Sequence, residues 1–265
     1  MRKSNPLISV VINADTRPEK NTDDGLFNGT VNLDYLTDGI ANKIKFFSEY
    51  DTEIILFIDK HQEIPEDTLR YIQSICDVVV IRKHTHETNF NDFNYITALF
   101  LARGKYIAHF DQDTFAFAPD NRAIESMLHW LEQFDYISYP SHQSPAPCHD
   151  DTFDHWWAST RFFICKRATI DFTELRKCQE DYDYWLKTYP VKRACHWTEH
   201  LLGSISKYKG KGVFYPPMNI NVCAIFTFAH YEKWTLRRLN EQTYDEIKKF
   251  IADKGHIQYP NDIRC

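Results

Sequence analysis

Short apolar runs alternate with amphipathic stretches along the first half of the chain. The apolar runs have the near-continuous pattern of buried strands and occupy residues 7–12, 53–58, 77–81 and 105–110. Between them, apolar residues recur every three or four positions, as from Leu33 to Phe47, which predicts helices with one buried face. This alternation with short connections predicts an α/β fold, with a mostly parallel central sheet and helices on both of its faces.

The second half of the chain has less regular elements. A helix is predicted after Pro119, and three prolines between residues 140 and 154 predict a long loop. Further strands are predicted at residues 136–139, 161–165, 213–215 and 224–228, and further helices at about residues 172–178 and 198–208. We expect this half to add a small antiparallel subregion to the main sheet.

Two short patterns mark the ends of helices. Gly104 follows the helix expected over residues 91–103 and suits the left-handed position just past a helix. Thr243-Tyr-Asp-Glu246 is a capping box, in which the side chains of the first and last residues each bond the backbone N–H of the other. We expect the helix that follows to be structural.

The composition narrows the class of protein. At 265 residues the chain can bury one substantial core, so we expect a single domain over residues 1–265. A net charge of -6 argues against a general nucleic-acid binder, whose surface would be basic. The seven cysteines form no Cys-x-x-Cys pair, which argues against zinc binding and favours reduced thiols in a cytoplasmic protein.

No stretch of the sequence is expected to cross a membrane. A bilayer needs roughly 20 apolar residues in a row, and no segment approaches this length. The apolar run at residues 7–12 is also too short for a signal peptide. We therefore expect no transmembrane segment, which is compatible with a peripheral attachment to a membrane.

Two aspartates stand one residue apart where the strand at residues 105–110 ends. Side chains two positions apart on an extended chain point the same way, so Asp111 and Asp113 would present two carboxylates about 6 to 7 Å apart. Hard divalent cations such as Mg²⁺ or Mn²⁺ bind such a pair and commonly share it with a diphosphate. An isolated Asp-x-Asp more often ends a strand in a solvated turn. The surrounding sequence therefore has to decide between a metal site and an ordinary turn.

A polar loop, Asn13-Ala-Asp15-Thr-Arg17-Pro, follows the first strand. Ligands of open α/β sheets bind outside the carboxyl ends of the strands, so Asn13, Asp15 and Arg17 are placed to contact one. Ordinary turn chemistry explains these three residues equally well.

The segment Ala-Arg-Gly-Lys-Tyr-Ile-Ala-His-Phe-Asp-Gln-Asp, residues 102–113, resembles the Asp-x-Asp strand of nucleotide-diphospho-sugar glycosyltransferases of the GT-A fold, above all the family-2-like group. Asp59, at the end of the second strand, also matches this family, and the resemblance extends over residues 7–120. The chain departs from it at Tyr95-Ile96, where an Arg-Asn pair is usual, and after Asp59, where Lys-His replaces Gly-Ser.

The resemblance implies hexosyl transfer from a nucleotide-diphospho-sugar, with a UDP-sugar favoured, to a glycan or lipid-linked acceptor. It implies that Asp113 binds Mn²⁺ or Mg²⁺ directly and that Asp111 binds the ribose or a metal-bound water. His230 would be a further metal ligand, and Asp59 would lie near the base or ribose. The donor would then bind to residues 1–120 and the acceptor to residues 121–265.

An inverting transfer needs a carboxylate that takes the proton of the attacking hydroxyl. The resemblance implies that this base lies at the start of a helix beyond the acceptor loop, where Glu199 stands, with Asp150, Asp151, Asp181 and Asp183 as rivals. A retaining enzyme would need no such base. Two other functions stay open: a nucleotidyltransferase, whose first loop is usually rich in the glycine that residues 13–17 lack, and a non-catalytic nucleotide- or sugar-binding protein.

Overall fold

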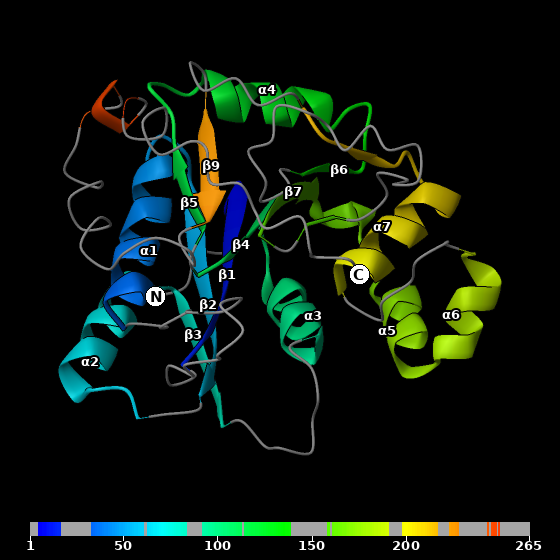
Figure 1. Cartoon of the computed structure of the whole chain (residues 1–265), viewed down its shortest axis with the longest axis horizontal. Coiled ribbons are helices and arrows are strands. Elements are labelled where there is room, and N and C mark those ends of the chain that lie inside the picture. Colours follow the sequence, from blue (N-terminus) through cyan, green and yellow to red (C-terminus); the bar gives the residue numbers. More distant parts are fainter. Residues whose placement is uncertain are drawn as a thin grey trace.

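The structure is a computed structural model of the chain. It describes residues 5–16, 33–60, 63–83, 92–112, 114–138, 158–159, 161–190, 198–216, 223–227, 243, 245–247 and 249. Figure 1 shows that these residues form a central sheet with helices on either side.

Seven strands make up the central sheet, namely β1 (Ile8–Asp15), β2 (Thr52–Lys60), β3 (Val78–Lys83), β4 (Tyr106–Asp111), β6 (Tyr136–Ser138), β7 (Phe162–Lys166) and β8 (Val213–Phe214). Their order is β3-β2-β1-β4-β7-β6-β8. The first four are parallel, β7 runs antiparallel to both β4 and β6, and β6 is parallel to β8. The predicted mostly parallel sheet is confirmed.

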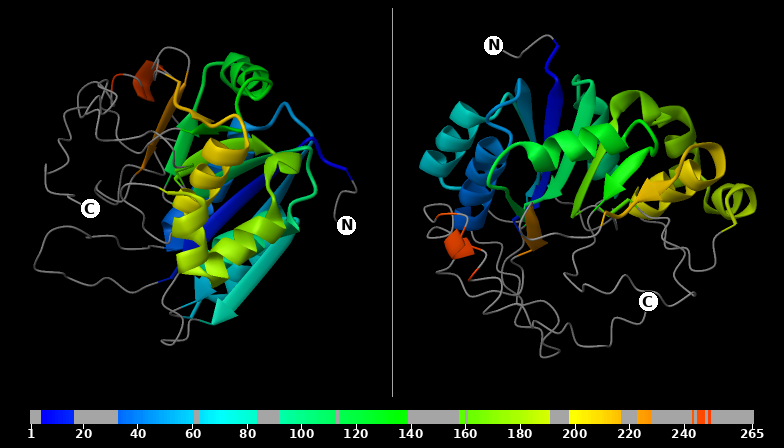
Figure 2. Two further views of the ribbon diagram at one scale, coloured as in Figure 1. Left: turned by 90° about the vertical axis from the view of Figure 1, so that its right-hand side faces the viewer. Right: turned by 90° about the horizontal axis from the view of Figure 1, so that it is seen from above.

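Helices cover both faces of the sheet, as predicted (Figures 1 and 2). One face packs against α1 (Leu33–Phe46), α2 (Glu66–Ile75) and α4 (Arg122–Trp130). The other packs against α3 (Asp92–Leu101), α5 (Phe172–Glu180), α6 (Tyr182–Thr188) and α7 (Thr198–Lys209). A short 3-10 helix, Arg167–Thr169, follows β7. Among the residues that the structure describes, no helix is long and apolar enough to span a bilayer.

The two faces follow from the alternation of side chains along each strand. Successive residues of a strand point to opposite faces, so Val10 and Ile12 join the core under α1, α2 and α4, whereas Val11 joins the other core. Val11 pairs in register with Ile55 of β2, and both belong to the same core. Odd-numbered residues of β1, β2 and β4 therefore share the face that α3, α5 and α7 cover.

The chain leaves the main sheet just after Asp111. Residues Thr114–Phe117 form a separate strand, β5, which pairs antiparallel with β9 (Ala224–Thr227). These two strands are a small antiparallel subregion of the kind expected. The sequence pattern does not predict β5 itself, because four residues are too few to show a strand period.

The expected left-handed conformation at Gly104 is wrong. Among the described glycines, a positive φ is found at Gly212, at 82°. Gly104 is instead needed for close packing, since a Cβ there would lie 2.5 Å from the backbone nitrogen of Ser9. Its N–H donates to Ser9 Oγ at 2.7 Å, and that hydroxyl donates to the buried Glu53 at 2.6 Å. The start of β4 is thereby joined to β1 and β2.

The capping box at Thr243 is confirmed. The backbone N–H of Thr243 donates to Glu246 Oε2 at 2.8 Å, and the N–H of Glu246 donates to Thr243 Oγ1 at 3.4 Å. Ile247 is buried next to it. That the helix is purely structural stays a prediction.

The described cysteines are free thiols. Burial raises the pKa of Cys76, Cys178 and Cys223 to about 12, so these thiols stay protonated and poorly reactive near neutral pH.

Glu174 joins the three helices α5, α6 and α7. Its carboxylate accepts hydrogen bonds from Tyr189 Oη at 2.6 Å and Tyr184 Oη at 2.9 Å, and Lys209 Nζ lies 3.1 Å away. Burial raises the pKa of this carboxyl group, but the donors outweigh burial, and the pKa lies below its usual value of 4.5. The charged form of Glu174 is therefore stabilised by folding.

Replacing Glu174 with Ala is expected to lower the free energy of unfolding by about 2 to 3 kcal/mol, because the buried Tyr189 hydroxyl and the Lys209 ammonium lose a charged partner. Denaturant unfolding monitored by circular dichroism measures this. Glu180→Ala is the matched control, since the ion pair of Glu180 with Arg176 on the same helix is exposed, and solvent-exposed ion pairs contribute little to stability.

The contribution of Glu174 should also depend on pH. Because its pKa is lowered on folding, the stabilisation is present above the unfolded-state pKa of about 4.5 and is lost as the pH falls through the folded-state value. The difference in stability between the unaltered chain and Glu174→Gln should therefore shrink below pH 4.5. A difference that stays constant down to acidic pH would contradict this role.

Candidate functional site

The ends of three parallel strands bring the predicted polar residues together at one edge of the sheet. Asn13 of β1 pairs in register with Asp111 of β4, and two positions further along β1, Asp15 pairs with Asp59 of β2. Asn13, Asp59 and Asp111 occupy odd positions, so their side chains lie on the face that α3 covers. The polar residues thus follow the apolar part of the same sheet face.

This edge is also the point at which the order of the strands reverses. The chain passes from β1 to β2 and β3 on one side, and then crosses to β4 on the other side of β1. In open α/β sheets, ligands bind at the carboxyl ends of the strands beside such a switch point. Asn13 and Asp111 are in-register neighbours on β1 and β4 at this switch point.

Asp111 is held by a tyrosine from α3. Tyr95 donates its hydroxyl hydrogen to Asp111 Oδ1 at 2.7 Å, and both residues are partly exposed. The Tyr95 ring also lies against the imidazole of His109, with 5.2 Å between the ring centroids. Tyr95 occupies the position at which the sequence departs from its family resemblance, so the sequence alone assigned it no role.

A buried histidine holds Asn13. The Asn13 amide nitrogen lies 2.8 Å from His109 Nε2, and the imidazole stacks on Phe163 with 5.0 Å between centroids and 10° between planes. Both Asn13 and His109 are buried. The amide oxygen of Asn13 is buried too and has no hydrogen-bond donor among the described residues. His109 stands two positions before Asp111 on the same strand, so its side chain is expected on the same face of the sheet. This spacing is the sequence signal by which His109 could have been found.

The start of α7 lies at the same edge of the sheet. Ala158 donates its N–H to the carbonyl oxygen of Glu199 at 3.0 Å, and the next residue, Ser159, donates its N–H to Ser138 Oγ at 2.9 Å. Ser138 ends β6 at the level of His109 in β4. Glu199 is therefore near the carboxyl end of β4, on the side of β6 and β7.

Glu199 is a partly buried acid in the first turn of α7. Its side chain is 17% exposed, and its Oε1 lies 3.9 Å from His200 Nε2. Two of the alternative candidates for the catalytic base, Asp181 and Asp183, are exposed to solvent. Asp181 is exposed and caps α6 by accepting the N–H of Tyr184 at 2.8 Å, and Asp183 is exposed in the first turn of that helix.

Several predicted site residues lie outside the described part of the chain. These are Arg17, Asp113, Asp150, Asp151 and His230. Asp15 is described in its backbone alone. The roles assigned to all of them stay predictions.

Oxygen donors predominate in the described part of this edge. The carboxylates of Asp59 and Asp111 and the amide oxygen of Asn13 are hard ligands of the kind that Mg²⁺ and Mn²⁺ prefer. Among the described residues, no three His, Cys, Asp or Glu side chains form a group that could hold a metal ion by themselves. The chemistry of these oxygen donors fits a divalent cation.

Comparisons with known proteins give distant likenesses to solved structures. No family model and no curated protein matches the sequence. Among solved structures, the chain resembles the mannosyltransferase PcManGT from Pyrobaculum calidifontis in complex with GDP-Man and Mn²⁺ (14% identity, 83% of this chain and 56% of that chain, TM-score 0.46). It also resembles a putative nucleotide-diphospho-sugar transferase from Desulfovibrio desulfuricans G20 (8% identity, 79% of each chain, TM-score 0.43) and S. aureus TarS (11% identity, 80% of this chain and 58% of that chain, TM-score 0.42).

These likenesses concern the arrangement of the backbone. The chain spans 56% of the length of the mannosyltransferase and 58% of that of TarS. Since one fold hosts many activities, the function of this chain has to be inferred from its own residues.

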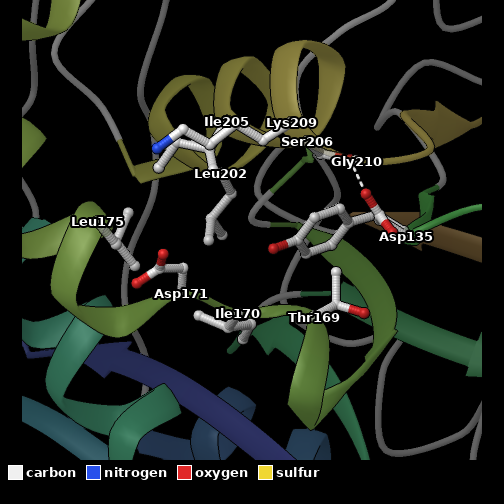
Figure 3. A pocket seen from close by; sticks show the side chains of 11 residues that line it. Asp135, Thr169, Ile170, Asp171, Leu175, Leu202, Ile205, Ser206, Lys209 and Gly210 are labelled. Atoms are coloured by element: carbon white, nitrogen blue, oxygen red, sulfur yellow. Dashed lines mark hydrogen bonds between the residues drawn. The ribbon is translucent and has the colours of Figure 1, made fainter.

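A cavity of about 290 Å³ lies away from this edge, between α5, α7 and the start of β6 (Figure 3). Asp135 and Ser206 line it and are joined by a hydrogen bond of 2.6 Å, drawn in Figure 3. The neighbouring Tyr136 lies in the sheet at the level of Ile107, near the beginning of β4. The cavity is therefore at the opposite end of β4 from Asp111.

Proposed function

We propose that this protein is a metal-dependent glycosyltransferase that moves a sugar from a nucleotide-diphospho-sugar to a hydroxyl acceptor. The observation that carries this proposal is the pairing of Asn13 with Asp111 across the strand switch point, with Asp113 two residues further on. A polar site at this position suits a nucleotide diphosphate with its cation.

Asp111 and Asp113, with His230, would hold Mn²⁺ or Mg²⁺. When bound, the cation acts as a Lewis acid that offsets the charge of the leaving diphosphate. Tyr95 supports this role, because its hydrogen bond fixes the orientation of the Asp111 carboxylate. Asn13, Asp15, Arg17 and Asp59 would bind the nucleoside and the phosphates, and we favour a UDP-sugar as the donor.

Glu199 would serve as the base of an inverting transfer. It lies at the carboxyl edge of β4 but on the β7 side, which leaves the β1 side for the donor. Its carboxylate would take the proton of the acceptor hydroxyl as that oxygen attacks the anomeric carbon and the bond to the diphosphate breaks. A glycan or a lipid-linked sugar is the proposed acceptor. The free thiols favour a cytoplasmic location.

A donor screen tests this function. The purified chain is incubated with UDP- and GDP-sugars and Mn²⁺, and the release of nucleoside diphosphate is followed by chromatography. Slow hydrolysis of one donor that stops with EDTA would support the proposal. Release of pyrophosphate from a nucleoside triphosphate would indicate a nucleotidyltransferase, and binding of a donor without any cleavage, with or without glycan acceptors, would indicate a binding protein.

Tyr95→Phe is expected to weaken the binding of Mn²⁺ in the presence of UDP or GDP by about tenfold, because groups that orient a metal ligand typically matter by this amount. Calorimetric titration measures the affinity. Tyr184→Phe is the control, since it removes a tyrosine hydroxyl that bonds Glu174 far from this edge. Equal affinities of the Tyr95 variant and the unaltered chain would show that Asp111 needs no such support.

A further inference from the structure

A buried lysine of α1 lies under the segment that carries the two aspartates. Lys43 is fully buried, and its Nζ donates to the carbonyl oxygen of Thr114 at 2.5 Å and to that of Gln112 at 3.3 Å. These two carbonyl groups stand on either side of Asp113. The backbone carbonyl groups of Gln112 and Thr114 thus receive an ammonium group from a helix that is about 70 residues away in sequence.

The groups around the Lys43 ammonium are carbonyl oxygens and aromatic rings, which suit a cation. Besides the two carbonyl oxygens, the rings of Phe110 and Phe115 face its Nζ, with centroids at 5.3 and 5.1 Å. Aromatic faces and carbonyl oxygens both carry negative potential, which offsets the cost of burying the charge. A lysine on an amphipathic helix usually reaches water instead. Because Lys43 is buried instead, we look for a role of its ammonium group in the fold or in the site.

Gly39 lets α1 approach the same segment. A Cβ at Gly39 would lie 2.6 Å from the carbonyl oxygen of Gln112, closer than such atoms pack. Glycine is unfavourable inside a helix, so its presence one turn before Lys43 is explained by this approach. Two residues of α1 therefore meet the Gln112 carbonyl group.

The backbone of Gln112 is held from β1 as well. Its N–H donates to the carbonyl oxygen of Asn13 at 2.9 Å. The peptide group before Gln112 is thus bonded to β1, and the peptide group after it, which leads into Asp113, is bonded to Lys43. Together these contacts restrict the backbone on both sides of Gln112, and with it the direction in which Asp111 points.

We propose that Lys43 and Gly39 are positioning residues that hold the backbone of Gln112 and Thr114, and through it Asp111, in the conformation that binds the divalent cation and the diphosphate. This inference rests on the proposed function. Lys43 does not touch the ligands in this role, because it acts through the carbonyl groups of Gln112 and Thr114.

Manganese binding tests the inference. The affinity for Mn²⁺ with UDP or GDP is measured by the loss of the free Mn²⁺ signal in electron paramagnetic resonance, well below the melting temperature. Lys43→Met and Gly39→Ala should each weaken binding by about tenfold or more, as expected for groups that orient metal ligands. Ile40→Ala is the control, because it removes a buried side chain of the same helix from the core. It should lower the melting temperature and leave the affinity within about twofold of the unaltered chain, since it removes core packing but keeps both Gly39 and Lys43.

The outcomes separate this inference from the proposed function. If Lys43→Met and Gly39→Ala remain folded and bind Mn²⁺ as tightly as the unaltered chain, the positioning role is wrong and the proposed function is untouched. If the unaltered chain binds no Mn²⁺ with either nucleotide, the proposed function fails and the inference with it. Should Lys43→Met not fold, Gly39→Ala decides alone, because it keeps the lysine.

Discussion

Replacing Asp111 with Asn is expected to reduce the Mn²⁺-dependent cleavage of the donor by about a hundred- to a thousandfold. A cation that stabilises the leaving diphosphate contributes several kcal/mol to the barrier, and each 1.36 kcal/mol corresponds to about a factor of ten in rate. Asn is isosteric and still accepts the hydrogen bond from Tyr95, so the loss would come from the missing charge and not from misplacement of the side chain.

The control for this variant is an aspartate at the other end of the sheet. Asp77 directly precedes β3, and its carboxylate accepts the N–H of Ile54 at 2.8 Å. Asp77→Asn should leave the rate of donor cleavage unchanged. A similar loss in both variants would indicate a general effect on folding, and undiminished cleavage by Asp111→Asn would remove this residue from the metal site.

Glu199→Gln is expected to reduce sugar transfer to the acceptor by about a hundred- to ten-thousandfold while donor and metal affinities stay as they are, since general-base catalysis has this magnitude. The amide keeps the shape of the side chain but cannot take up the proton. Stability should fall by no more than about 1 kcal/mol, the usual contribution of an acid in the first turn of a helix. Comparing kcat with the dissociation constant of the donor separates the two effects.

The aspartates on α6 provide the comparison for Glu199. Asp183→Asn, an exposed acid in a helix first turn, should retain full activity. If Glu199→Gln transfers sugar at the normal rate, the base is another residue or the reaction retains configuration. If it loses donor affinity in proportion to activity, Glu199 binds the donor and does not act as a base.

The edge of the sheet could be predicted because it follows from local pattern. The apolar runs in the sequence predict β1, β2 and β4, and the polar residues at their ends are Asn13, Asp59 and Asp111. The register of the strands then brings these residues to one edge of the sheet. The period of two along a strand puts such residues on one face once the register of the parallel strands is given.

The supports of the site could not be predicted in this way. Tyr95 and Lys43 each reach the segment that contains Asp111 from a helix, and neither contact is encoded in a spacing along the chain. Lys43 is the clearer case, because a charged residue in an amphipathic helix is expected to face water. Gly104 shows a related limit: the sequence identifies a position that requires glycine, and the reason, close packing on Ser9, lies in the fold.

The most direct measurement is a crystal structure of the protein with Mn²⁺ and UDP or GDP, in which the anomalous scattering of manganese locates the ion. We predict that the ion lies beside the Asp111 carboxylate at the carboxyl ends of β1 and β4, with the diphosphate bound to it. Manganese and nucleotide bound elsewhere, for instance in the cavity between α5 and α7, with nothing at Asp111, would contradict the proposed function.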